Sequence, residues 1–248
     1  PITPDSWRWI FKLAAVPAML GLLVLVALPE SPKWLASRHA VTKPAPPLRE
    51  RFRFPLRRLT LVGIALGAIP LVGAWAASKW MIPWADKISG AAQPGYKAVT
   101  QGWWALGATL GSFFGAQIAG LLGRRASYFL ISLGATILTL AMFQLTAPLQ
   151  PSFLPIVFAQ GFVATLFFGW LPLYLPELFP TRVRASGSGI AYNTGRFATA
   201  AGVFVAGALF TALDGDYARV GALCALGYVL GMVVIRWAPD TSAKSLDE

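Results

Sequence analysis

The chain has 248 residues, of which 56% are hydrophobic and 12% are charged, and its formal net charge at pH 7 is +11. Soluble domains usually carry about 25% charged residues, so this composition excludes an ordinary soluble domain and is typical of a polytopic membrane protein. The mean hydropathy of +0.60 agrees with that class. Cys224 is the one cysteine, so no disulfide framework can form within the chain.

Seven apolar segments are long enough to cross a membrane as helices. A hydrocarbon core about 30 Å thick requires roughly 20 helical residues, and a helix satisfies its own backbone hydrogen bonds in lipid. We therefore predict an all-α fold of seven transmembrane helices, with Pro70 weakening or kinking the second. The predicted spans are residues 10–28, 56–77, 98–122, 127–145, 153–175, 187–213 and 220–237.

Lysine and arginine gather in the loops at one end of these spans. By the positive-inside rule, we expect this end and the C-terminus to be cytoplasmic. This distribution makes the basic charge an orientation signal, and nucleic-acid binding is the poorer interpretation. The basic residues at this end are Lys33, Arg38, Lys43, Arg49, Arg51, Arg53, Arg57, Arg58, Arg124, Arg125, Arg182, Arg184, Arg236 and Lys244.

Glycines recur at helical spacing on the third span, where Gly107, Gly111 and Gly115 form one stripe. Small residues at such spacing allow helices to approach closely in lipid. We predict helix packing here and at the pairs Gly63–Gly67 and Gly227–Gly231, although a transporter would use the same faces for sliding contact.

The seven spans differ in polarity. The fourth and seventh are almost wholly apolar and are predicted to face lipid. The second, third, fifth and sixth carry Trp, Gln, Asn, Lys or Arg at depth, and we expect them to line an aqueous space.

Four motifs lie at the ends of spans that are predicted to be cytoplasmic. They are LPESPKWL at 28–35, LLGRRASYF at 121–129, YLPELFPTRVRASGSG at 174–189 and APDTSAKSLDE at 238–248. In this order they resemble the sugar-and-other-transporter branch of the major facilitator superfamily. The resemblance implies that residues 1–35 are the last helix of an N-terminal half, residues 36–55 a cytoplasmic linker, and residues 56–248 a C-terminal six-helix bundle with a short tail.

The resemblance also implies a function. A family member would move a small polar or anionic organic solute, sugar-like or an organic acid, by alternating access across a bacterial inner membrane. The solute would bind between this bundle and an N-terminal half expected to precede it. GAWAASKW at 73–80 replaces the glutamine pair of hexose carriers, which argues against hexose as the solute. PTRVRASGSGIAYNTGR at 180–196 resembles the organic-ion and acid-metabolite carriers of the same branch more closely.

Two alternatives belong to other classes. A membrane enzyme would need a catalytic constellation, and the sequence offers no Ser/His/Asp set, metal cluster or Walker A loop. We therefore expect no enzyme activity, cofactor or metal. A non-transporting sensor or scaffold of the same fold remains the alternative to a transporter.

The charged motif residues are expected, by resemblance, to form an ion-pair network that closes the cytoplasmic gate. The other interpretation is that they are solvated charges at the interface. The acids of this set are Glu30, Glu177 and Asp240, and the cations are Arg124, Arg125, Arg182 and Arg184.

Eight further residues are candidates for solute binding. Arg196, beside Asn193 and about two turns into the sixth span, suggests either an anion contact or a structural arginine that caps carbonyls. Lys79, near Trp75 at the outer end of the second span, could attract an anion or belong to an interfacial aromatic belt. The remaining candidates, each of which could also serve helix packing, are Gln101, Trp104, Gln160 and Trp170.

Acidic residues and histidine are absent from all seven predicted spans. If transport is coupled to an ion such as the proton, the coupling carboxylate would come from the N-terminal half.

Overall fold

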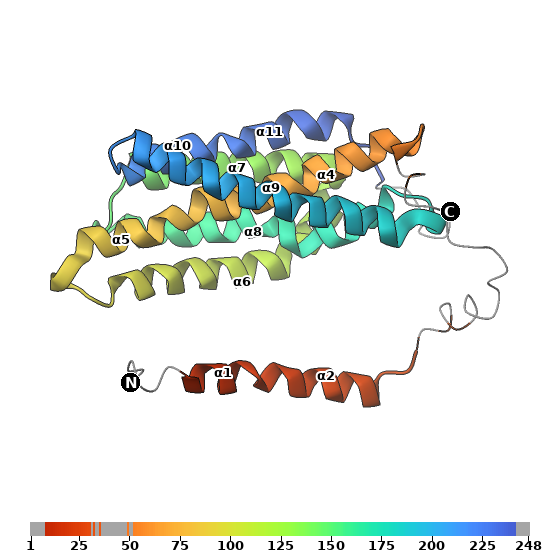
Figure 1. Ribbon diagram of the computed structural model, residues 1–248, viewed down its shortest axis with the longest axis horizontal. Coiled ribbons are helices and arrows are strands. Elements are labelled where there is room, and N and C mark those ends of the chain that lie inside the picture. Colours follow the sequence, from red (N-terminus) through yellow and green to blue (C-terminus); the bar gives the residue numbers. More distant parts are fainter. Residues whose placement is uncertain (1–7, 31, 33–34, 36–48, 50–51, 242–248) are drawn as a thin grey trace. The chain divides into compact units, whose positions relative to one another are not determined.

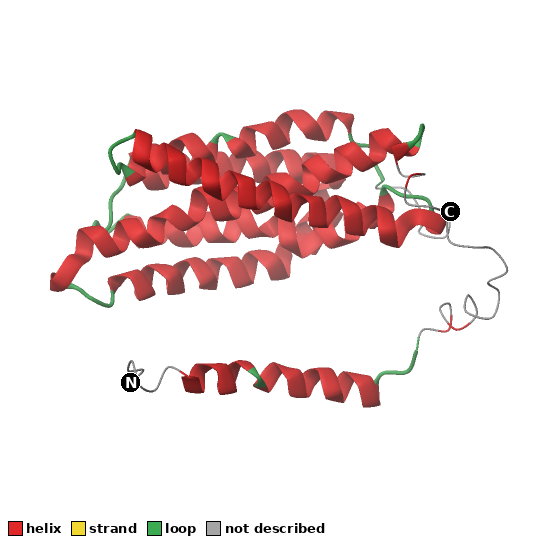
Figure 2. Ribbon diagram, in the orientation of Figure 1, coloured by secondary structure: helices red, strands yellow, loops and turns green. Residues whose placement is uncertain are grey.

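The computed structural model describes residues 8–30, 32, 35, 49 and 52–241, and it contains helices but no strand among these residues (Figures 1 and 2). The predicted all-α class is confirmed. The chain divides into two compact units, Pro1–Ala45 and Pro46–Glu248.

The first unit contains α1 (Arg8–Ala14) and α2 (Val16–Ala27), which cover most of the predicted first span. The helix is interrupted at Ala15, because Pro17 in the first turn of α2 cannot donate a backbone hydrogen bond to the preceding turn. Leu28 is extended, as expected of a residue before proline. Most of the linker predicted at 36–55, up to residue 51 apart from Arg49, lies outside the described residues.

The second unit is a bundle of six long helical segments (Figure 1). Each is long and apolar enough to cross a membrane, whereas the apolar helix Phe11–Ala27 of the first unit is shorter. The segments are α4 (Leu56–Val72) continued by η2 (Gly73–Ala77), η3 (Ser78–Trp80), α5 (Met81–Ser89) and η4 (Gly90–Ala92); α6 (Tyr96–Leu122); α7 (Arg124–Gln144); α8 (Phe153–Glu177); α9 (Arg184–Ala212), preceded by η5 (Thr181–Val183); and α10 (Tyr217–Ala225) with α11 (Gly227–Val234) and η6 (Ile235–Trp237).

The second predicted span is longer than the sequence indicated. The chain does not leave the bundle at Ala77 but continues through a π-helical turn and a 3-10 turn into α5. The irregular turns begin three residues after Pro70, whose missing N–H disrupts the regular ladder. Trp84 of α5 is buried against the rings of Phe143 and Phe153. The predicted end of this span at residue 77 is therefore wrong.

The glycine stripe on α6 packs against α8. A methyl group placed on Gly107, Gly111 or Gly115 would collide with backbone carbonyls of α8, and one on Gly169 of α8 would collide with Ser112 of α6. The two backbones are therefore in direct contact along this crossing. The predicted packing role of this stripe is confirmed.

The other two glycine pairs have different outcomes. Gly63 and Gly67 of α4 face Ala191 of α9, as the packing interpretation expects. Gly231 of α11 lies against Ser132 and Tyr128 of α7, but a methyl group on Gly227 would meet open space. The Gly227–Gly231 pair is therefore not a packing stripe, because only one of its members faces another helix.

The fourth predicted span, now α7, is not mainly lipid-facing. It packs against α8, α10 and α11 and buries Ser132, Thr136 and Thr139 together with one apolar face, whereas Leu130 and Ile137 are exposed. The Tyr128 hydroxyl donates a 2.8 Å hydrogen bond to the Leu66 carbonyl of α4. By contrast, α6 and α9 have the least buried apolar windows of the six segments. Apolar composition alone did not distinguish a lipid-facing helix from a core helix.

Candidate functional site

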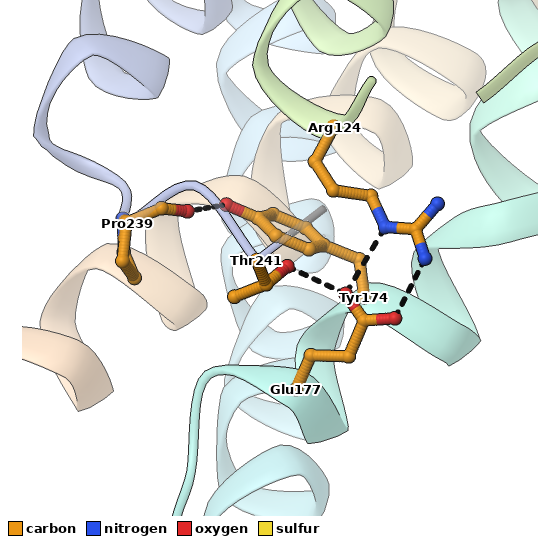
Figure 3. Close-up of polar contacts among 5 residues, drawn as sticks. All are labelled: Arg124, Tyr174, Glu177, Pro239 and Thr241. Carbon is orange, nitrogen blue, oxygen red and sulfur yellow. Dashed lines mark hydrogen bonds and ion pairs between the residues drawn. The ribbon is translucent and has the colours of Figure 1, made fainter. Parts of the chain in front are cut away.

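An ion pair joins the first residue of α7 to the last residue of α8 (Figure 3). Arg124 donates to Glu177 through Nε at 3.0 Å and through Nη2 at 2.8 Å, which is the bidentate geometry that suits a guanidinium and a carboxylate. The Glu177 side chain is only 9% exposed and that of Arg124 22% exposed. Gly123 makes this approach possible, because its φ of +82° turns the chain tightly from α6 into α7.

The segment after the last helix closes over this pair. The Thr241 hydroxyl donates a 2.6 Å hydrogen bond to Glu177 Oε2, and the Tyr174 hydroxyl donates one of 2.8 Å to the Pro239 carbonyl (Figure 3). Arg125 Nη2 donates a further bond of 2.9 Å to the Arg236 carbonyl. The tail is therefore attached to α8, and the η6 turn that precedes it is attached to α7. Thr241 and Tyr174 were not predicted, because the tail motif directed attention to the acid Asp240.

The remaining gate candidates are placed differently. Arg125 donates to a backbone carbonyl. Arg184, the first residue of α9, donates a 3.4 Å hydrogen bond from Nε to the Phe179 carbonyl. Asp240 is exposed beside Thr241. Glu30 belongs to the first unit, and the side chain of Arg182 lies outside what the structure describes. Of the predicted charges, Arg124 and Glu177 are thus brought into direct contact.

A second, half-buried polar cluster lies where η3 meets α6. Lys79 Nζ donates a 3.1 Å hydrogen bond to Gln101 Oε1 and lies 3.4 Å from the centroid of the Trp104 ring. Gln101 is five residues into α6, which corresponds to about 8 Å along the helix axis. The predicted position of Lys79, at the outer end of its helix, is wrong, because α5 continues beyond it.

Gln160 of α8 connects this cluster to residues of η3 and α7 through hydrogen bonds. It is fully buried, and its Oε1 accepts a 2.8 Å hydrogen bond from Trp104 Nε1. Its Nε2 donates to Ser78 Oγ and, at 3.2 Å, to Thr139 Oγ1. Both ends of this amide are occupied by the protein, so the geometry favours a positioning role for Gln160 over direct solute contact. Ser78 and Thr139 are members of the network that the sequence did not reveal.

The other four solute-binding candidates lie elsewhere. Trp75 is 57% exposed and, with Lys79, borders a shallow hollow of about 160 Å³. Trp170 is buried in the core against Tyr128 and Tyr174. This position favours the packing interpretation for Trp170.

Asn193 and Arg196 are exposed on α9. Asn193 borders a different hollow, of about 370 Å³ between α8 and α9, and its Nδ2 donates to the Gly189 carbonyl at 2.9 Å. The Arg196 guanidinium carbon is 5.5 Å from the Tyr192 ring centroid. No group of three or more His, Cys, Asp or Glu that could hold a metal ion occurs in the described part of the chain.

Six apolar spans, an ion-paired helix end and a half-buried lysine within one of the spans define a polytopic integral membrane protein. The family model described as "Sugar (and other) transporter" matches residues 2–46 and 57–248. The chain therefore belongs to this transporter family of the major facilitator superfamily, which is a family of transporters and not of enzymes.

Three relatives illustrate the similarity. The chain is 28% identical over 245 residues to a "Probable 4-methylmuconolactone transporter" of Cupriavidus pinatubonensis, covering 98% of this chain and 55% of that protein. It is 27% identical over 206 residues to the "Cis,cis-muconate transport protein" of Acinetobacter baylyi, covering 80% and 49%. It is 29% identical over 258 residues to the "Inner membrane metabolite transport protein YhjE" of Escherichia coli, covering 97% and 56%. The chain thus spans about half the length of these relatives.

Proposed function

We propose that this chain is the C-terminal portion of a transporter that moves a small organic acid across a membrane by alternating access. The family supports transport of a small solute, and two relatives, a muconate transport protein and a probable methylmuconolactone transporter, support the organic-acid class. An inner-membrane relative from a bacterium supports a bacterial inner membrane, and the positive-inside rule supports a cytoplasmic C-terminus.

The position of Lys79 carries the proposal. Its ammonium lies inside a membrane-spanning segment, and among the described residues it has no carboxylate partner. A cation removed from water is costly unless an anion or strong acceptors compensate it. Gln101 and the Trp104 ring provide partial compensation, the ring contact being worth about 0.5–2 kcal/mol. The carboxylate of a solute would provide the rest.

Alternating access requires a second wall and a gate. The exposed apolar faces of α6 and α9 suit contact with an N-terminal portion of the protein as well as with lipid. The Arg124–Glu177 pair, with the tail folded over it, is suited to hold the cytoplasmic end of the bundle closed. A carboxylate for proton coupling, if the protein is a symporter, would lie in the N-terminal portion.

Uptake by the full-length protein in proteoliposomes tests this function. We expect cis,cis-muconate to accumulate inside the vesicles and to be competed by other small carboxylates but not by inositol, a neutral polyol. Vesicles without protein are the control. Correctly folded protein that moves no carboxylate from a broad panel would contradict transport and favour the sensor or scaffold interpretation.

A further inference from the structure

Two adjoining hollows lie where α4 begins and the last helical segment ends. One has a volume of about 570 Å³ and the other about 500 Å³. They share Phe54, Arg58 and Trp237 in their walls, so together they form one groove between α4 and the end of α11 with η6. This groove is separate from the Lys79 cluster and from the hollow beside Asn193.

The outer part of the groove is strongly basic. Arg57, Arg58, Arg125 and Arg236 line it, and no acidic residue does. Within the described part of the chain, Arg57, Arg58 and Arg236 form no ion pair. The Arg125 bond to the Arg236 carbonyl fixes two of these positions relative to each other. Four exposed guanidinium groups lining one groove give it a positive potential that attracts anions.

The inner part of the groove is apolar. Leu61, Val62 and Ala65 follow Arg58 at helical spacing along one side of α4, and Val234 of α11 forms the facing wall. From Arg58 to Ala65 the groove runs about 10 Å along the helix axis toward the middle of the membrane. Trp237, 54% exposed at the basic end, is a side chain typical of the membrane interface.

We propose that this groove binds an anionic phospholipid from the membrane leaflet on that side. The arginines would contact the phosphate, and an acyl chain would lie against Leu61, Val62 and Ala65. A free phosphate ion would be attracted by the same arginines but would leave the apolar part empty. Basic pockets between transmembrane helices are suited to lipid headgroups, and each arginine near an anionic surface contributes about 1 kcal/mol.

Lipid binding by the purified full-length protein in detergent tests the proposal, with retained lipids counted by native mass spectrometry. We expect dioleoyl phosphatidylglycerol to bind at least about fivefold more tightly than dioleoyl phosphatidylcholine. Arg58→Gln should weaken phosphatidylglycerol binding about fivefold, and Arg58→Lys should retain most of it. The matched control is Arg53→Gln, an exposed arginine at the same helix end that lines neither hollow.

Two further measurements separate a lipid from a free anion. Ala65→Phe keeps every charge but fills the apolar part, and it should reduce phosphatidylglycerol binding. Inorganic phosphate and glycerol 3-phosphate, which lack acyl chains, should fail to displace the lipid from the unaltered protein, a readout that does not depend on the folding of any variant. Equal effects of Arg53→Gln and Arg58→Gln, equal binding of both lipids, or displacement by millimolar inorganic phosphate would each overturn the proposal.

Discussion

Arg124 and Glu177 are joined by hydrogen bonds of 3.0 and 2.8 Å at the point where α7 begins and α8 ends. The carboxylate accepts a third bond, of 2.6 Å, from Thr241 in the tail. Three segments that are distant in sequence therefore meet on one carboxylate that is almost fully buried (Figure 3). The energetic importance of this junction can be measured.

Replacing the carboxylate tests the pair directly. Glu177→Gln keeps the side-chain shape but removes the negative charge that accepts two Arg124 hydrogen bonds, so we expect a loss of about 1.5–3 kcal/mol, measured as a lower unfolding midpoint in detergent. Asp86→Asn is the matched control, because the Asp86–Lys97 pair is about half exposed and should contribute less than about 1 kcal/mol. Equal shifts for the two variants would contradict a special role for the buried pair.

The tail contact gives a second prediction. Thr241→Val preserves shape but removes the hydroxyl that donates to Glu177, and the lost bond to a charged group corresponds to about 1.5–3 kcal/mol. Thr241→Ser keeps the hydroxyl and should behave like the unaltered protein. Limited proteolysis of the C-terminal tail provides the readout, with faster cleavage expected only for the valine variant. Identical cleavage of both variants would mean that the hydroxyl does not hold the tail.

The α6–α8 crossing gives a third prediction. Gly111→Ala places a methyl group against the Phe162 carbonyl and should destabilise the bundle by about 1–3 kcal/mol or more, because the backbone cannot move aside as a side chain would. Gly120→Ala on the same helix meets open space and should be neutral or slightly stabilising. Thermal unfolding of the two variants measures the difference. A Gly111→Ala protein as stable as Gly120→Ala would contradict the observed backbone contact.

Much of the fold follows from simple features of the sequence. The length of each apolar run predicted each long segment, because a single segment in lipid can satisfy all of its backbone hydrogen bonds only as a helix. The LLGRRASYF motif lies where the third predicted span ends, and the chain turns there from α6 into α7 at Gly123, which has a positive φ. The path after Ala77 could not be predicted in this way. Lys79 and Trp84 resemble interfacial residues in composition, and the continuing helix that buries Trp84 depends on contacts with Phe143 and Phe153.

The candidate site was predictable in its residue types but not in its connections. Lys79, Gln101, Trp104 and Gln160 were each candidates, yet their grouping comes from the register between η3, α6 and α8. That both ends of the Gln160 amide are occupied depends on Ser78 and Thr139, two small hydroxyl residues with no distinctive local pattern. The contact between Thr241 and Glu177 joins residues separated by 64 positions, which local sequence rules do not specify.

The central claim is that the Lys79 ammonium binds the carboxylate of the solute, and it rests on the proposed transport function. The most direct measurement compares uptake of cis,cis-muconate by proteoliposomes holding the full-length protein, Lys79→Gln, Lys79→Arg or Lys87→Gln. Lys87 is an exposed lysine on the neighbouring α5 and serves as the matched control.

We expect Lys79→Gln to reduce uptake at low solute concentration by about tenfold or more, the value of a hydrogen bond to a charged group. Lys79→Arg should retain part of the uptake, and Lys87→Gln should retain all of it. Uptake by Lys79→Gln equal to that of Lys87→Gln, with both proteins folded, would contradict the claim.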